Sequence, residues 1–341
     1  MRDLVQDKAR MWGHLSALAG GGKVATHFAP DAVAEIAHPY GTSTGPALAR
    51  FYADLHRALP DAEWRPEIFI AGHNHPDTRT DAPRFSPLVG SFGHWQGTFT
   101  EPLQGIAPTG GVVHLRICEV HHLNDAGQIA RAWILPDFLD LMDQAGQFPL
   151  PPMRGARGMW PGPKGGGGVR MGAVDEAGGN AAMAAVLDMH NALNTHVGAD
   201  VSGLTMAHWD PNFMYYAAAG IGICRGVDGF RRHHQIPFRK AVPDRHSKGH
   251  FVRIADGQFA LTGGRLYATQ TGPYLGMPAT GRQVWMDVMD FYHFDARSDA
   301  RSDGAGLITE NWLPFDIPLM AHKMGVELLG ARAIPGAIGA G

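Results

Sequence analysis

Two stretches of this 341-residue chain decide the fold: residues 100–110 read TEPLQGIAPTG, and residues 271–281 read TGPYLGMPATG. Threonine, proline, glycine, threonine and glycine recur at the same offsets in both. A strand-like run follows each stretch, VVHLRICEVHHL at 112–123 and VWMDVMDFYHF at 284–294. Similarity within one chain at a long, fixed spacing is typical of a duplicated structural unit. The sequence therefore predicts two diverged copies of one domain.

Further blocks match in the same order. RAWILPDFLDLMDQAG at 131–146 corresponds to ENWLPFDIPLMAHKMG at 310–325, and ALPD at 58–61 corresponds to AVPD at 241–244. The second copy carries a polar insertion, DARSDARSDGAG at 295–306, which we expect at the tip of a hairpin.

The segment between the copies is rich in proline and glycine. It has few residues that we expect to pack, and this composition predicts a linker. We place the domains at 1–150 and 180–330, with the linker at 151–179.

Each copy has the same predicted order of elements. Apolar residues at helical spacing predict a first helix, at 2–18 and at 181–196, and a second helix at 46–59 in the first copy. Strands with turn signals follow, and short helices at 138–144 and 319–323 close the copies. Helices followed by an antiparallel meander indicate the α+β class. No GxGxxG motif follows a strand, which argues against a dinucleotide site.

Composition narrows the classes of partner. The chain is 45% hydrophobic with a formal net charge of −3, so it lacks the basic field that nucleic acid or an anionic membrane needs. No apolar run approaches the roughly 20 residues of a membrane helix. The two cysteines, Cys118 and Cys224, form no CxxC pair and fit a reducing compartment. We expect a cytoplasmic protein that acts on a small, weakly charged molecule.

The 19 histidines raise the question of a metal site. The pairs His73/His75, His121/His122 and His233/His234 are too close for an HExxH-type helical face, and none has an obvious third ligand. Dispersed surface and loop histidines are the better interpretation. We therefore expect no metal.

Strand alternation identifies two candidate acids, because successive side chains point to opposite faces. One face of 112–123 is apolar except for Glu119 and His121, and the matching face of 284–294 is apolar except for Asp290 and Tyr292. Burial raises the pKa of a carboxyl group, which suits a general acid or base near neutral pH. The alternative is a structural hydrogen bond from each acid to a loop backbone or a Trp N–H.

A second acid follows a tryptophan by four residues in both copies. Trp133 precedes Asp137 and Trp312 precedes Asp316, so each half could aim an aromatic wall and an acid into one pocket. The alternative is that both aspartates cap the closing helices, a common role of Asp.

Two tyrosines are candidates for binding substrate. Tyr215 and Tyr216, in FMYYAAAGIG, could line the mouth of the second pocket or pack in the core. The cysteines have no activating pattern, and no GxSxG elbow is present.

Taken together, the Thr-x-Pro-x-x-Gly-x-x-x-Thr-Gly stretch, the strand with its acid, and the Trp-x-x-x-Asp block before a Leu/Met-rich turn resemble the SnoaL-like polyketide cyclases of the NTF2-like superfamily. The resemblance covers most of both halves. It implies two cone-shaped α+β domains, each with a curved antiparallel sheet, about three helices and an apolar pocket. It also implies aldol cyclisation or isomerisation without metal or organic cofactor, with a pocket aspartate as acid–base and a histidine nearby.

Under this resemblance Glu119 with His121, and Asp290 with Tyr292, would act as the acid–base pairs, and Asp137 and Asp316 are the rival acids. A binding protein without chemistry and an epoxide hydrolase-like enzyme are the alternatives, because fold alone does not fix function. The tyrosine at the second copy's histidine position means that the two pockets need not share one activity. Single-domain relatives dimerise through their sheets. A tandem can make that interface inside one chain, and further homo-oligomers can form.

Overall fold

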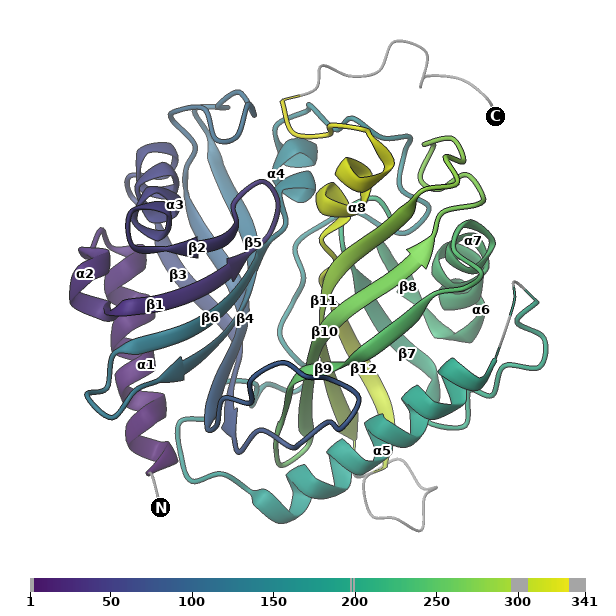
Figure 1. The fold of residues 1–341 in the computed structure, drawn as a ribbon, viewed down its shortest axis with the longest axis horizontal. Coiled ribbons are helices and arrows are strands. Elements are labelled where there is room, and N and C mark those ends of the chain that lie inside the picture. Colours follow the sequence, from purple (N-terminus) through teal and green to yellow (C-terminus); the bar gives the residue numbers. More distant parts are fainter. Residues whose placement is uncertain (1–2, 197, 199, 296–305, 331–341) are drawn as a thin grey trace.

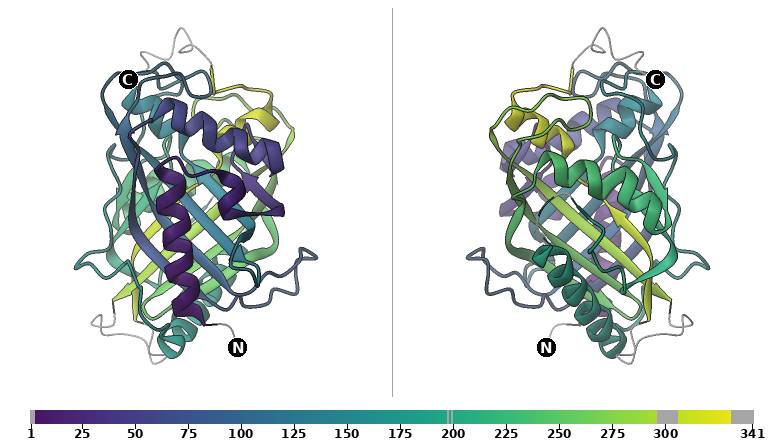
Figure 2. Two further views of the ribbon diagram at one scale, coloured as in Figure 1. Left: turned by 90° about the vertical axis from the view of Figure 1, so that its left-hand side faces the viewer. Right: turned by 90° about the vertical axis from the view of Figure 1, so that its right-hand side faces the viewer.

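The structure, a computed structural model, describes residues 3–196, 198, 200–295 and 306–330. Two six-stranded sheets face each other in the middle of the molecule, and helices cover their outer faces (Figures 1 and 2). The strand orders are β2-β1-β6-β5-β4-β3 and β8-β7-β12-β11-β10-β9. Because the two orders are the same, the predicted duplication of one α+β unit is confirmed.

The first half contains these elements: α1 (Leu4–Ala19), α2 (Val24–His27), β1 (Phe28–Ile36), β2 (Gly41–Thr44), α3 (Gly45–Ala58), β3 (Glu63–Gly72), β4 (Leu88–Thr98), β5 (Val112–Leu123), β6 (Ile129–Pro136) and α4 (Phe138–Gln144). The second contains α5 (Glu176–Thr195), β7 (Trp209–Ala217), β8 (Ile223–Arg225), α6 (Gly226–Phe230), a π-helical turn (Arg231–Gln235), α7 (Ile236–Ala241), β9 (His246–Asp256), β10 (Phe259–Thr269), β11 (Gln283–Asp295), β12 (Leu307–Leu313) and α8 (Ile317–Met324). Among the helices described, none is both long and apolar enough to cross a bilayer.

The first helices of the two halves begin in the same way. The Asp3 carboxylate accepts the backbone N–H of Val5, and the Asp175 carboxylate accepts that of Gly178. Such caps satisfy N–H groups that have no partner inside the helix.

The sheets are mixed, not purely antiparallel as expected. Strands β3 to β6 and β9 to β12 form antiparallel meanders, but β1 pairs in parallel with β6, and β7 with β12. The difference arises because the first strand of each half joins the sheet beside the last one. Of the polar insertion between β11 and β12, residues 296–305 lie outside the described part of the chain.

Strand alternation divides each sheet into a helix-covered face and an inter-sheet face. On β5, Val113, Leu115 and Ile117 belong to the core under the helices. Cys118 and Val120 belong to a second core, shared with Met289 and Phe291 of the other half. The rings of Phe92 and Phe291 lie 6.2 Å apart across this interface. The two sheets thus pack face to face within one chain.

Two aspartates fasten the halves reciprocally. Asp137 caps α4 by accepting the N–H of Asp140 (3.0 Å), and it also accepts the N–H of Ala219 in the other half (3.0 Å). Asp316 caps α8 through Leu319 (3.0 Å) and accepts the N–H of His38 in the first half (2.9 Å). The contacts repeat with the halves exchanged, as in a symmetric dimer.

The connection between the halves is docked on both of them. Trp160 is fully buried in the inter-sheet core, with the Arg116 guanidinium 3.9 Å from the centre of its ring. Phe69 N–H on the edge strand β3 donates to Gly168 O (2.9 Å), and Arg170 N–H donates to Phe69 O (2.9 Å). The expectation of a linker with few packed residues is wrong at these positions, because the segment fills the sheet junction and extends a sheet edge.

Candidate active site

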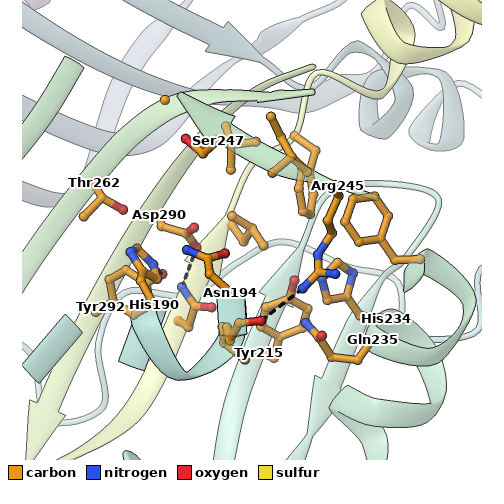
Figure 3. A pocket seen from close by; sticks show the side chains of 18 of the residues that line it. His190, Asn194, Tyr215, His234, Gln235, Arg245, Ser247, Thr262, Asp290 and Tyr292 are labelled. Carbon is orange, nitrogen blue, oxygen red and sulfur yellow. Dashed lines mark hydrogen bonds between the residues drawn. The ribbon is translucent and has the colours of Figure 1, made fainter. Parts of the chain in front are cut away.

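A cavity of about 150 Å³ opens in the second half, between the helices and the helix-covered face of the sheet (Figure 3). Aromatic and aliphatic side chains form much of its wall, including Trp209, Phe230 and Leu313. Polar groups converge on it from four elements and the π-helical turn: His190 of α5, Tyr215 of β7, His234 of the π-helical turn, Asp290 and Tyr292 of β11, and Asn311 of β12. An apolar hollow with a few convergent polar groups is the usual form of a small-molecule site.

Asp290 is the one carboxylate among the described residues that line this cavity. Asn311 Nδ2 donates to its Oδ1 at 3.1 Å and also to the backbone carbonyl of Phe291 at 2.9 Å, which fixes the amide. Burial raises the pKa of Asp290 from 3.8 to about 7, although hydrogen bonds from Asn311 and Tyr292 oppose the shift. A carboxyl group with this pKa can both accept and give a proton near neutral pH.

Beside Asp290, the Tyr292 hydroxyl lies 2.9 Å from Nε2 of His190. Burial raises the pKa of Tyr292 well above 10, and the negative charge of Asp290 adds to this effect, so the phenol keeps its proton. Burial and the neighbouring His250 lower the pKa of His190 well below 6.5, so its ring is neutral. Tyr292 is therefore a neutral proton donor held by a neutral imidazole.

Three further polar atoms belong to residues that line the cavity. Tyr215 Oη, His234 Nδ1 and His190 Nδ1 have no hydrogen-bond partner among the described residues, and all three are buried. A buried polar atom without a partner costs about 1–3 kcal/mol. A bound molecule with oxygen atoms would remove that cost.

The equivalent acid of the first half is sealed in the core. Glu119 pairs across the strands with Ser91, as Asp290 does with Thr262, so the two acids occupy the same register. Glu119 and His121 are each 1% exposed, with Oε2 and Nε2 3.5 Å apart, and neither lines any of the four main cavities in the described part of the chain. Burial raises the pKa of Glu119 to about 8 and lowers that of His121 to about 3, so both are neutral at pH 7.

Two substitutions between the copies account for this difference. Trp95, which is 1% exposed, stands in the first half where Leu266 lines the cavity of the second. Ala132 stands opposite His121, whereas Asn311 stands opposite Tyr292. The first half thus has a larger side chain filling the space and lacks the amide that holds the acid.

The stability of Glu119→Gln relative to that of the wild type is expected to increase as the pH rises. The folded state holds the Glu119 proton up to about pH 8, while the unfolded chain releases it near 4.5. The protonated Glu119 therefore contributes its full amount to the free energy of unfolding of the wild type below pH 4.5. This contribution is lost as the pH rises through 8. At about 1.4 kcal/mol per pH unit, a difference of about 2 kcal/mol should open between pH 6.0 and 7.5.

Urea unfolding of both proteins across this range measures the effect. A difference between them that does not change with pH would contradict the buried, protonated state of Glu119.

The rival acids Asp137 and Asp316 lie outside the cavity, at the helix starts and the junction between halves described above. Arg116 Nη1 also pairs with Asp137 at 2.8 Å. The structure places both aspartates as helix caps, which is the alternative that the Trp-x-x-x-Asp pattern left open.

The two tryptophans lie on the inter-sheet face. Trp312 is fully buried there, and its Nε1 donates to Pro161 O at 2.9 Å. Trp133 stacks on Phe251 of the other half, with ring centres 5.1 Å apart, and lines a separate cavity of about 400 Å³ between the sheets. The tryptophans and the aspartates therefore do not share one pocket, which was the other interpretation of the pattern.

The two tyrosines divide between the faces. Tyr215 lines the cavity, whereas Tyr216 stacks on Trp312 between the sheets, with ring centres 5.4 Å apart. Only Tyr215 can reach a molecule in the cavity.

Sequence reasoning missed His190, Asn311 and His234. Asn311 faces the same way as Leu313 on β12, so the alternation applied to β11 could have found it. His190 and His234 lie on helical segments far away in the sequence, and no pattern in one sequence links them to Asp290.

Family models match both halves. The model of the SnoaL-like domain matches residues 186–300, and that of the SnoaL-like polyketide cyclase matches residues 86–145. No curated protein sequence gives a significant match.

Solved structures resemble about two-fifths of the chain, the size of one half. AclR of Streptomyces galilaeus, a candidate hydroxylase, is 21% identical and covers 42% of this chain and 95% of its own (TM-score 0.34). IdmH of Streptomyces antibioticus, a candidate polyketide cyclase, is 17% identical and covers 41% of this chain and 98% of its own (TM-score 0.33). An NTF2-like protein of Burkholderia thailandensis E264 is 20% identical and covers 42% of this chain and 96% of its own (TM-score 0.33).

Proposed function

Since this chain is a tandem of two SnoaL-like domains, we propose that its second half is an acid–base enzyme of the polyketide cyclase kind, acting on a small hydrophobic carbonyl compound. The observation that carries the proposal is Asp290, with a pKa near 7, on the wall of a largely apolar cavity beside the Tyr292–His190 pair. Perturbed acids in a cleft are candidates for catalysis. The reaction class is an aldol cyclisation or an isomerisation, and it needs only the side chains of the cavity.

Each group has a role in such a reaction. The Asp290 carboxylate removes a proton from the carbon next to a carbonyl, and the resulting carbanion attacks the acceptor carbonyl or is reprotonated at another carbon. In the tautomer with hydrogen on Nε2, His190 donates to the Tyr292 oxygen. The phenol proton, which Tyr292 donates to Asp290 before the reaction, then passes to the developing alkoxide, and the proton that Asp290 has taken from carbon returns to the phenolate. Preorganised donors at that oxygen are often the largest contribution to catalysis. Asn311 orients Asp290.

The first half is proposed to have a structural role. Its acid lines none of the four main cavities found among the described residues, and its inter-sheet face packs against the second sheet. The epoxide hydrolase alternative requires an arginine and two acids around one water, whereas the described cavity lining supplies one acid. The binding-protein alternative predicts that ligands enter the cavity and leave unchanged.

Tyr292→Phe is expected to lower kcat about 100-fold on a substrate found by screening small ketones and ketoesters, because it removes one donor to the developing oxyanion. The matched control is Tyr216→Phe, the same change on the inter-sheet face, which should leave kcat within about twofold.

Thermal shifts with the same compounds measure binding separately from turnover. Compounds that raise the Tm of the wild type without being converted would favour the binding protein. Equal kcat in Tyr292→Phe and the wild type would remove Tyr292 from the mechanism.

A further inference from the structure

A cluster of metal-ligating groups lies at the junction of the two halves, away from the cavity of Asp290. It consists of His38, in the loop after β1, His322 on α8, and Glu327, which follows α8. One ligand atom from each lies within 4.8 Å of the other two. None of the three lines the Asp290 cavity, so the cluster has no part in the chemistry proposed above.

One distance within the cluster matches the spacing of two ligand atoms around a small cation. His38 Nε2 lies 3.3 Å from Glu327 Oε2, and His322 Nδ1 is in short contact with Glu327 Oε1. Two ligand atoms that each lie 2.0–2.1 Å from a tetrahedral zinc ion are about 3.3 Å apart. The centres of the two imidazole rings are 4.6 Å apart. The glutamate thus already stands between two imidazole nitrogens.

The backbone at His38 is tied to the start of the helix that carries His322. His38 N–H donates to Asp316 at the start of α8, at 2.9 Å, so the first ligand is fixed against the helix that carries the second.

The related junction on the other side of the molecule has none of these ligands. Ala219 occupies the position that corresponds to His38. Its N–H donates to Asp137, just as the N–H of His38 donates to Asp316. When the two closing helices are aligned at their capping residues, Asp137 and Asp316, Asp143 corresponds to His322. Phe148 corresponds to Glu327 in the same alignment. Asp143 pairs instead with Arg157 at 3.1 Å. The cluster is therefore not a by-product of the shared architecture but a feature of one junction.

From this geometry we propose that His38, His322 and Glu327 form a binding site for a divalent transition metal of the zinc type, which joins the first half to the closing helix of the second. Two imidazoles and a carboxylate are a ligand set that zinc accepts, with the fourth position open to water. This proposal departs from the sequence expectation of no metal, and its ligands come from segments about 280 residues apart that the fold brings together.

Isothermal titration of the full untagged chain with zinc chloride tests the proposal. The expected result is one saturable site whose affinity falls at least about 100-fold in His322→Gln and in Glu327→Gln, since each loses a direct ligand. His246→Gln, an exposed histidine outside the cluster, is the matched control and should bind like the wild type. Cobalt(II) should give the absorption of a four-coordinate ion in the wild type and lose it in both variants.

Zinc should also raise the Tm of the wild type and not that of the two variants, because a ligand that binds only the folded state stabilises it. Both substituted side chains are exposed, so the variants are expected to fold. The absence of a saturable site, or equal affinity in His322→Gln, Glu327→Gln and the wild type, would overturn the proposal. Because turnover is not measured, failure here leaves the acid–base function of the second half untouched.

Discussion

Asp290→Asn is expected to lower kcat/KM by about 100- to 10,000-fold, the contribution usually made by a positioned general base. The substitution preserves the shape of the side chain and its contact with Asn311, while the amide cannot accept a proton from carbon. In the wild type, kcat/KM should rise with pH and level off above about 7, because Asp290 must be ionised to act as the base and its pKa is about 7.

Measuring kcat/KM between pH 5 and 9 for both proteins tests this expectation. The variant should lose the rising limb as well as the rate, which a merely structural role of Asp290 would not produce.

Glu119→Gln is the matched control for Asp290→Asn, since it makes the same chemical change at the equivalent position of the first half. It should leave kcat/KM within about twofold, because Glu119 is sealed among core side chains. The double variant should then behave like Asp290→Asn alone. Unchanged turnover in the double variant would exclude both acids from the mechanism, and a loss in Glu119→Gln equal to that in Asp290→Asn would contradict the structural role of the first half.

Asp256→Asn is expected to destabilise the protein by about 3–5 kcal/mol, the usual cost of leaving a buried charge without its partner. Asp256 Oδ2 lies 2.7 Å from Lys8 Nζ across the junction of the halves, and both side chains are fully buried. Arg170 Nε of the connecting segment lies 2.9 Å from the other carboxylate oxygen. One carboxylate therefore compensates charges from the first half and from the connection, and the amide would compensate neither.

Urea unfolding followed by tryptophan fluorescence and by circular dichroism measures the loss, and agreement of the two probes establishes a single transition. Glu63→Gln, which removes the exposed partner of Arg65, is the control and should change the free energy of unfolding by less than about 1 kcal/mol. The pair Lys8→Met with Asp256→Leu should recover the part of the loss that comes from Lys8, because apolar residues can replace a buried ion pair, while Arg170 still lacks its partner. A loss as small as that of Glu63→Gln would show that water reaches Lys8.

The two halves illustrate why a repeat predicts a fold better than it predicts a site. Alternation along β5 and β11 correctly places Glu119 and Asp290 on the helix-covered face, because the direction of a strand side chain depends only on its position in the strand. Whether that face holds a cavity depends on side-chain volumes contributed by neighbouring strands. Trp95 in place of Leu266 is one such difference, and it becomes meaningful only when the strand register is known.

By itself, the sequence determined the duplication, the α+β class, the closing helix of the first half, and the face that carries each acid, since all of these follow from local periodicity and from similarity between the copies. The tertiary structure alone decided which acid borders a cavity, which tyrosine reaches it, that His190 and Asn311 belong to the site, and that His38 meets His322 and Glu327. The physical reason is that cavities, burial and ligand clusters are set by contacts between segments distant in the chain, and no local pattern of residues encodes those contacts.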